Sequence, residues 1–395
     1  MKFELSNIPT DIGSLKSLIW IVETDNGSKN MVLNLSSIAD NQTLTAYLSF
    51  ISEEMSVKAN GKFTVILQGD KLYKAEREII SGKKYEAGNR YTAEIDNSSE
   101  TMQWEELANM SFTVKIDENL GFNIPFPTSG ETPANIMVDW GDGSALTIVN
   151  KGTTLSDGDG FNYEYAETGE YAIAIYSDQV DETEQQIPKI NFWNNRNNNN
   201  NHQKLVLINT PFLNTETEDF SYCFYYCSNL TSIPTGLFDK NINVTNFNYC
   251  FQSCEKISNI PTGLFDKNIE VEAFNACFSH CTNLKEIPKG LFDKNKKATN
   301  FMRCFSFCSN VTLNKNIFSN EGNTDRFSGM NMLFNYCFQN AGEQNENPGE
   351  APELWKYERG SSTWNTTGCF YNAKATNLTS DNKYNTEWGT PLNWN

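Results

Sequence analysis

The sequence predicts a multidomain protein in which two all-β sandwiches precede a right-handed solenoid of α/β repeats. The first observation is an eight-residue phrase that recurs at a fixed period of 27 residues between Phe220 and Cys308, a pattern typical of solenoids. The second is a series of short apolar and β-branched runs separated by turn signals. The third is the length of 395 residues, which exceeds one ordinary core. We therefore expect domains at residues 1–108, 109–192 and 193–395.

Charge and composition narrow the classes of partner. The formal net charge is −18, which argues against nucleic acid, whose phosphates would be repelled, and against a polybasic membrane anchor. No apolar run is long enough to span a bilayer, so we expect no direct membrane insertion by this sequence. No apolar segment of the signal-peptide kind follows Met1. An exported protein would therefore be anchored through a segment outside this sequence.

The first predicted domain has the pattern of a β-sandwich. Four apolar runs, separated by Asn-Gly and Gly-Asp turn signals, predict short strands. These runs are Leu18–Val22, Leu44–Leu48, Phe63–Leu67 and Tyr91–Ile95. The closing segment Lys83–Ile95 resembles the last hairpin of fimbrillin-type domains from bacterial surface fimbriae. That resemblance implies a fimbrillin-like β-domain, and the strand pattern by itself fits a generic β-sandwich equally well.

The second predicted domain contains two motifs typical of a sandwich. Val138–Ser144 carries the letters W-G-D-G, and Tyr163–Ile175 carries Y-x-x-x-G-x-Y. We expect Trp140 to fill an inter-sheet core, and Asp142 with Gly143 to form a turn between strands. The two motifs together resemble the PKD family of Ig-like sandwiches. That resemblance implies a spacer or stalk module.

A calcium site is the alternative explanation for the acidic residues of this domain. Calcium binds carboxylate oxygens. The four candidate ligands are Asp139, Asp142, Asp157 and Asp159. Asp-Gly pairs are also ordinary turn chemistry, and no bidentate glutamate closes a recognisable calcium loop. We therefore expect no metal here.

The joint before the repeats is marked by low complexity. Residues 194–201 are asparagines around one arginine and are expected to form an exposed loop. Within residues 203–219, the segment Leu205–Leu213 is an abbreviated copy of a phrase that recurs later. A shortened first repeat is typical of the cap that begins a solenoid.

The third domain is an array of six repeats. Each repeat begins with an eight-residue head, Phe-x-x-Cys-Phe-x-x-Cys in the first four copies. The last two copies keep the frame but end on Ala341 and Ala373. A second phrase, Ile-Pro-x-x-Leu-Phe-Asp-Lys-Asn, follows each of the first three heads, and its Asp-Lys-Asn is expected to form a turn. The heads start near residues 220, 247, 274, 301, 334 and 366.

All ten cysteines fall at head positions four and eight. Three interpretations compete for them: disulfides within or between coils, zinc sites made of four cysteines from adjacent coils, and small buried core residues. Alanine at position eight of the last two heads favours packing, because alanine preserves volume and abolishes both disulfide and metal chemistry. The predicted core cysteines are Cys223, Cys227, Cys250, Cys254, Cys277, Cys281, Cys304, Cys308, Cys337 and Cys369.

Each head is expected to form a short helix on the outer face, and Asn229–Pro234 a short strand in a parallel sheet. The recurring Cys, Pro and aromatic positions resemble BspA-type leucine-rich repeats of bacterial surface proteins. The full predicted architecture is therefore two all-β Ig-like sandwiches followed by a right-handed α/β leucine-rich-repeat-type solenoid. The resemblance implies an adhesive surface that binds protein or matrix.

The sequence offers few candidates for catalysis. His280 lies between two head cysteines, which is the spacing of a nucleophile with its base. The equivalent positions of the other heads hold Tyr, Ser, Phe and Asn, so this position is variable and exposed. His202 is the only other histidine, and no phosphate loop or nucleophile elbow is present. We expect no enzyme activity, no catalytic residues, no cofactor and no metal.

Binding residues are expected where the predicted strands and heads face solvent, because repeat proteins bind with stacked surfaces. Tyr225, Tyr249 and Tyr336 would add aromatic contacts. The candidate binding surface comprises Thr231, Ser232, Ser258, Asn259, Lys285, Glu286 and Tyr226.

These patterns together lead to a function hypothesis. The chain is expected to be a non-enzymatic, extracellular adhesin of the cell surface, anchored in an outer membrane through a segment outside this sequence, with a protein or extracellular-matrix ligand. The first alternative is a surface glycan-binding module, which would need exposed aromatic platforms. The second alternative is a structural minor subunit of a fimbria, whose first domain would exchange a strand.

Overall fold

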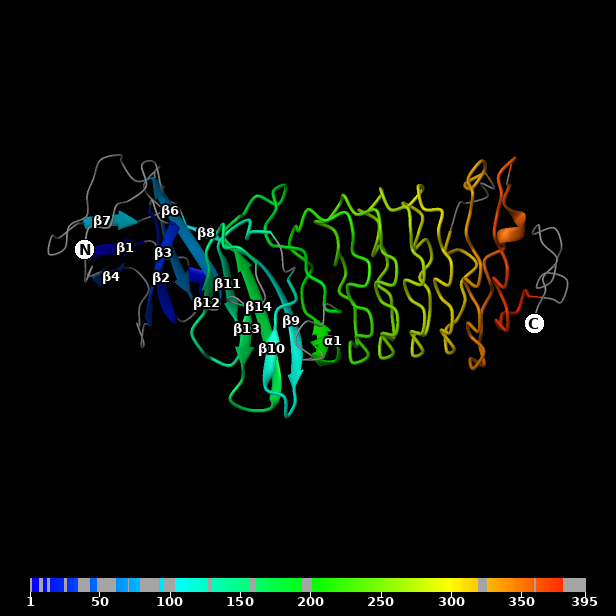
Figure 1. Ribbon diagram of the computed structural model, residues 1–395, viewed down its shortest axis with the longest axis horizontal. Helices are drawn as coiled ribbons and strands as arrows, with labels where there is room; N and C mark the ends of the chain where they lie inside the picture. The colour runs from blue at the N-terminus through cyan, green and yellow to red at the C-terminus, as the bar shows by residue number, and fades with distance from the viewer. Residues whose placement is uncertain are drawn as a thin grey trace.

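The structure is a computed structural model that describes part of the chain. It describes residues 2–6, 10–12, 15–24, 27–34, 43–47, 62–69, 71–78, 92–95, 104–126, 130–155, 161–193, 201–318, 325–358 and 360–378. The described parts form an elongated molecule, with two groups of β-sheet followed by a row of stacked coils along the long axis (Figure 1). Residues 83–91 of the segment that resembles fimbrillin, Asp157, Asp159 and the asparagine run 194–200 lie outside the described residues.

The N-terminal region contains two sheets. A three-stranded sheet has the order β4-β1-β7, and a five-stranded antiparallel sheet has the order β3-β2-β5-β6-β8. Each of the four predicted runs overlaps one strand of these sheets. The strands are β1 (Lys2–Ser6), β2 (Ser17–Thr24), β3 (Gly27–Asn34), β4 (Thr43–Tyr47), β5 (Lys62–Gln68), β6 (Leu72–Glu78), β7 (Thr92–Ile95) and β8 (Glu105–Glu106), with a 3-10 turn η1 (Thr10–Ile12).

The middle region is built around one five-stranded sheet of order β12-β11-β14-β9-β15, with β10 and β13 forming a separate two-stranded ribbon. Its elements are β9 (Ala108–Ile116), β10 (Gly121–Asn123), β11 (Ile136–Asp139), β12 (Thr147–Val149), β13 (Asn162–Glu164) and β14 (Gly169–Ser177). Trp140 is fully buried, stacks on Tyr163 at 4.6 Å, and donates its indole N–H to Thr147 at 2.8 Å. Gly141 has a left-handed φ of 78°, and a Cβ there would lie 2.4 Å from the carbonyl oxygen of Ala172.

The fifth strand of the middle sheet comes from beyond the joint. Helix α1 (Asn201–Lys204) leads directly into β15 (Leu205–Ile208), which pairs antiparallel with β9. Residues predicted to cap a solenoid therefore complete the middle sheet. One continuous core follows, in which Phe192 packs edge-on against Phe112 of β9 at 5.1 Å and stacks on Phe224 of the first head at 5.5 Å.

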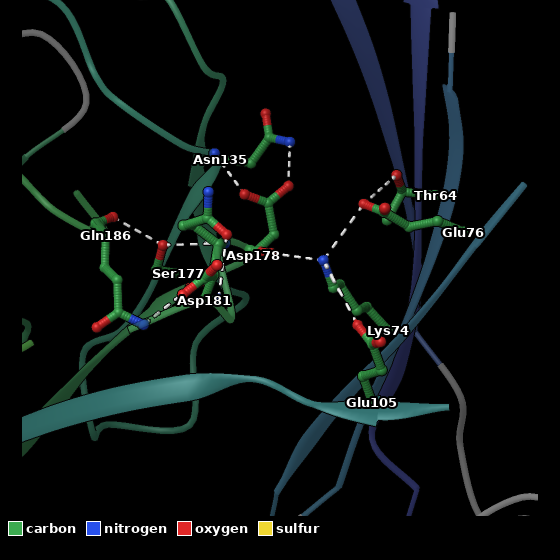
Figure 2. A network of polar contacts seen from close by, with 10 residues as sticks. Thr64, Lys74, Glu76, Glu105, Asn135, Ser177, Asp178, Asp181 and Gln186 are labelled. Atoms are coloured by element: carbon green, nitrogen blue, oxygen red, sulfur yellow. Dashed lines mark hydrogen bonds and ion pairs between the residues drawn. The ribbon is translucent and has the colours of Figure 1, made fainter. Parts of the chain in front are cut away.

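A polar network joins the N-terminal and middle sheets (Figure 2). Lys74 of β6 has a side chain only 7% exposed, and its ammonium donates to the backbone carbonyl of Asp178 at 2.5 Å and to Glu76 at 3.4 Å. The Asp178 carboxylate accepts from the backbone N–H of Asn135 at 2.8 Å, and burial raises the pKa of Asp178. A buried ammonium needs such partners, because an unpaired one is expensive to desolvate.

The six repeats stack as coils built from turns. In every head, the N–H groups of positions four, six and eight donate within the head to the carbonyl three residues earlier. The N–H groups of positions one, three, five and seven donate to the next coil, at 2.7 to 3.0 Å across all five junctions, as Tyr222 does to Asn248. Each backbone donor of the first five heads from position three to position eight therefore has a partner, as buried backbone requires.

The centre of the coil stack is aromatic. Phenylalanines at head positions one and five form two columns in which the rings of neighbouring coils lie 5.0 to 6.0 Å apart, as Phe224 and Phe251 do at 5.0 Å. A third column begins with Phe238 and Phe265 at 6.2 Å. Each such ring contributes about 1.5–3 kcal/mol when fully buried. The columns explain why the phenylalanine spacing recurs unchanged.

A buried column of amides runs beside the phenylalanines. The predicted turn Asp-Lys-Asn places its asparagine inward, and Asn241, Asn268 and Asn295 are 0 to 2% exposed. Asn268 donates to the carbonyls of Asn241 at 2.8 Å and Phe238 at 3.3 Å, and Asn295 repeats both bonds one coil later. In the next coil the guanidinium of Arg326 replaces the asparagine amide as the donor, and it donates to the carbonyl of Phe292 at 2.6 Å.

The predicted architecture is wrong. The structure is nearly all β, with 24% strand and 3% helix, in several small antiparallel sheets, and its described residues contain no α/β solenoid. The coil region has one 3-10 turn, η2 (Leu354–Lys356), and isolated parallel bridges instead of strands. The large sheet of the middle region takes its last strand, β15, from beyond the joint, and β10 with β13 forms a second, two-stranded sheet.

The heads are not helices because their backbone alternates in hand. Positions three and seven of all six heads have φ between 52° and 63°, which is the left-handed region. A helix cannot continue through such residues. The predicted strand at Asn229–Pro234 is absent, and the equivalent segments of the next coils make only isolated bridges, such as Asn259 with Glu286.

Candidate functional site

The candidate residues on the predicted strands lie on one polar face of the coil stack. Thr231 is exposed, and both its backbone N–H and its hydroxyl donate to the carbonyl of Val206 at 3.0 Å. Lys285 donates its backbone N–H to Ser258 at 3.0 Å. The structure thus brings these residues together as a ladder between coils. The remaining members, Ser232, Asn259 and Glu286, are also exposed or half-buried.

Tyr226 belongs to a different group of side chains. Its ring contacts Tyr225 at 4.5 Å and Trp193 at 5.7 Å, and Trp193 meets Tyr225 at 4.5 Å. Tyr222 continues the group by packing on Tyr225 at 5.3 Å and by stacking on Tyr249 of the next coil at 4.7 Å. We call Trp193, Tyr222, Tyr225, Tyr226 and Tyr249 the aromatic surface.

The head backbone explains why these tyrosines face solvent. Positions one, four, five and eight carry the phenylalanines and cysteines, which are buried in the first five heads where those residues occur. The left-handed turns at positions three and seven direct Tyr222 and Tyr226 outward, and these side chains are 38% and 44% exposed. Trp193, which ends the middle region, is 36% exposed beside them. In the first head, the alternation of hand therefore directs the phenylalanines and cysteines into the core and Tyr222 and Tyr226 toward solvent.

The aromatic surface has uncharged polar neighbours. Asn275 donates its side-chain amide to the Tyr249 hydroxyl at 2.9 Å, and its backbone N–H to the Asn248 side chain at 2.7 Å. Burial raises the pKa of Tyr222 and of Tyr225, so both phenols stay neutral at physiological pH. Neutral hydroxyl and amide groups offer both donors and acceptors.

The ten cysteines all lie in the core as free thiols, at most 2% exposed. Three of those at position eight donate to the carbonyl of position five in the preceding coil, as Cys254 does to Phe224 at 3.1 Å. Burial raises the pKa of each thiol. The thiolate is the nucleophile and the metal ligand, so these cysteines are poorly suited to either chemistry.

His280 and its flanking cysteines do not form a catalytic group. The imidazole is exposed, stacks on Phe307 at 4.6 Å and lies 2.9 Å from the Ser279 hydroxyl. Cys277 and Cys281 point into the core on the other side of the coil backbone. Among the described residues, no three His, Cys, Asp or Glu side chains are placed to hold a metal ion.

Sequence reasoning missed two members of the aromatic surface, Trp193 and Tyr222. Trp193 lies at the end of the middle region, next to a low-complexity run. Its packing against the first head could therefore not be predicted from the sequence. A usable signal was present for Tyr222, because the first head alone carries tyrosine at positions three, six and seven. The first head therefore shares the Phe and Cys positions of the other heads but differs from them in the residues between.

The described part of the chain contains no helix long and apolar enough to cross a membrane. Comparison of the chain with family models, with curated proteins and with solved structures finds no match.

Proposed function

We propose that this protein is a non-enzymatic adhesin of the cell surface that binds a protein or extracellular-matrix ligand through the exposed residues of its coils. One observation carries the proposal: six heads share one backbone, while their outward positions differ from coil to coil. Position three holds Tyr222, Tyr249, Ala276, Arg303, Tyr336 and Gly368. A constant frame with variable exposed residues is how repeat proteins build binding surfaces.

The resemblance to BspA-type repeats and to fimbrillin and PKD domains supports a surface location. Buried thiols with raised pKa values support a binding role over catalysis. The continuous core from the middle sheet to the last described coil supports a rigid rod that holds its ligand-binding face at a fixed distance from the N-terminal sheets (Figure 1).

The proposal is tested with the whole chain immobilised and exposed to matrix proteins such as collagen and laminin. We expect saturable binding that weakens when Asn259, Lys285 and Glu286 of the polar face are replaced together by alanine. A matched control replaces Lys267, Lys294 and Lys296, which are exposed elsewhere on the same coils. Saturable binding to sugars alone would exclude a protein ligand. Hydrolase activity that disappears on mutation of a single carboxylate would overturn the non-enzymatic assignment.

A glycan-binding surface module is the second candidate function. The aromatic surface favours it, because exposed aromatic platforms are what such a module requires. A glycan ligand on a neighbouring cell or in the matrix is compatible with adhesion.

A further inference from the structure

We infer that the aromatic surface is a binding site for an uncharged oligosaccharide, contacted by Trp193 and by tyrosines of the first two heads. This inference rests on the proposed function, a surface-binding protein, and adds the ligand class and the residues. It is carried by three independent observations: the exposure of the rings, the absence of charged residues from the first three heads, and the origin of the rings from two parts of the fold.

The first observation is where the exposed rings lie. Among the described residues, three Trp, Tyr and Phe side chains stand out as exposed, namely Trp193, Tyr222 and Tyr226, and all three belong to this one cluster. Full burial of a large apolar side chain contributes about 1.5–3 kcal/mol, and rings that are 36% to 44% exposed leave only part of that gain to a ligand. Clustered aromatic exposure marks interaction sites. The flat apolar faces of sugar rings pack against aromatic rings, while sugar hydroxyls bond to phenol and amide groups at the edges.

The second observation concerns charge. The heads 220–227, 247–254 and 274–281 contain no Asp, Glu, Lys or Arg, although 20% of the chain is charged. Twelve of these 24 positions are the buried Phe and Cys residues of the frame, so at that frequency about two charged residues would be expected among the other twelve. Their exposed and half-buried positions hold Tyr, Asn, Gln, Ser and one His instead. A face without charge offers no ion pair to an acidic glycan or a charged peptide. It fits a partner that is itself uncharged and rich in hydroxyl groups.

The third observation is that the site is composite. Trp193 follows the middle sheet and is held by a bond from its backbone N–H to the Asn191 side chain at 3.1 Å. Its indole meets the first head edge-on at Tyr225, and His202 of α1 packs against its other side at 5.1 Å. The tyrosines come from two coils that stack through Tyr222 and Tyr249. The surface therefore exists only when the joint and the first two coils are folded together.

The chain itself supplies substitutions that preserve the head backbone. Positions six and seven of the fifth head are Gln339 and Asn340, and Asn340 has the same left-handed φ as Tyr226. The double variant Tyr225→Gln, Tyr226→Asn therefore removes two rings in favour of residues that the frame already accepts. Trp193→Ala removes the ring from the other part of the site. Tyr336→Ala is the matched control, because the third head has alanine at that position.

The test is isothermal titration of the whole chain with neutral hexasaccharides of cellulose, mannan, xylan and chitin, and with anionic hexasaccharides of heparin and polygalacturonate. We expect at least one neutral series to bind, with an affinity unchanged between about 0.05 and 0.5 M salt. The double variant and Trp193→Ala should each weaken that binding at least tenfold, roughly 1.4 kcal/mol. Tyr336→Ala should leave it within about twofold of the original affinity.

Three results would overturn the inference. The first is binding of no neutral hexasaccharide while collagen or laminin still binds, in which case the proposed adhesin survives and its glycan site does not. The second is salt-sensitive binding of the anionic sugars only. The third is neutral-sugar binding that survives both variants. Failure of every sugar and every matrix protein to bind would count against the proposed function as well.

Discussion

Two residues per head decide the shape of the coil. Position three and position seven adopt a left-handed φ in all six heads, and only one of these twelve residues is glycine. For other residues this conformation costs roughly 1–2 kcal/mol, and asparagine tolerates it better than most. The cost is offset because the turn frees alternate N–H groups to bond to the next coil. Side-chain identity at these positions is therefore limited mainly by backbone strain.

His280 provides a test of this strain. Its φ is 60°, and a β-branched side chain is least compatible with that conformation. We expect His280→Val to lower the free energy of unfolding by about 1–2 kcal/mol relative to His280→Asn, whose residue occupies this position in the last two heads. Both variants lose the stacking on Phe307, so the difference isolates the backbone. Guanidinium unfolding of the two proteins gives the comparison, and equal midpoints would contradict the assigned strain.

His202 makes the stability of the joint depend on pH. Burial lowers its pKa below the usual 6.5, and among the described residues its Nδ1 has no hydrogen-bond partner. The unfolded chain therefore takes up a proton before the folded chain does as the pH falls through 6.5, and stability is lost below that pH. The neutral form contributes fully above it.

We expect the free energy of unfolding to decrease between about pH 7 and pH 5, and His202→Gln to make that decrease smaller. Partial burial also lowers the pKa of His280, despite the opposing charge of Glu255. Adding His280→Asn should therefore remove the remaining histidine contribution. Urea unfolding at a series of pH values measures this slope. A slope unchanged in His202→Gln would show that the folded site accepts the proton without cost.

At the scale of elements, the coil is held together by columns that run between repeats. Phenylalanine rings stack on their equivalents in the next coil, while cysteine thiols and asparagine amides donate to backbone carbonyls of the preceding coil. Regular strand pairing is reduced to isolated bridges. A column member therefore acts on two junctions at once, which is the nearest-neighbour coupling expected of repeat proteins.

Asn268 tests the amide column. It is fully buried, and its side chain satisfies two backbone carbonyls of the preceding coil. Asn268→Ala leaves both acceptors without that donor and should cost about 1–3 kcal/mol. Asn243→Ala is the matched control, because Asn243 is exposed on the preceding coil and should change stability by less than about 0.5 kcal/mol. Thermal unfolding of both variants measures the two losses of stability. A similar small loss in each would show that the amide column does not stabilise the coils.

The buried cysteines should not react with thiol reagents in the folded protein. Burial raises the pKa of these thiols and shields them from reagent. We expect a chromogenic disulfide reagent at neutral pH to label no thiol quickly in the native chain and all ten after unfolding in denaturant. Fewer than about eight reactive thiols after unfolding would indicate disulfides instead of core packing.

At the scale of the whole molecule, the middle sheet and the coils form one packing unit. The core cluster runs without interruption from Met110 to Ala373, and β15 binds the joint into the middle sheet. The N-terminal sheets attach through the separate cluster that includes Ile66 and Tyr176, and through the buried ammonium of Lys74 (Figure 2). The coils and the middle sheet therefore share one support.

Phe192 tests this coupling, because it contacts both Phe112 of the sheet and Phe224 of the first head. Phe192→Ala should cost about 3–5 kcal/mol. Hydrogen exchange should become faster in β9, in β14 and in the first coils together. Phe338→Ala, in the fifth coil, should act mainly on its neighbouring coils. Faster exchange confined to the middle sheet in Phe192→Ala would show two independent units.

The sequence by itself determined the repeat frame and the residues that fill its core. The 27-residue period located the heads, and alanine in place of cysteine indicated packing. Both inferences depend only on which residues occupy fixed positions, and the amino-acid sequence gives that information directly. The candidate site was readable only in part: Tyr225, Tyr226 and Tyr249 stood out as aromatic, while Trp193 and Tyr222 did not.

Only the tertiary structure decided the conformation of the heads and the composition of the aromatic surface. Phe-x-x-Cys spacing fits a helical turn as well as it fits paired turns of alternating hand, and local propensity does not separate them. The difference lies in hydrogen-bond partners one coil away, such as Tyr226 with Gln252. Trp193 likewise reaches Tyr225 because β15 closes the middle sheet and brings the joint against the first head. Such contacts depend on segments far apart in the chain, and no local pattern specifies them.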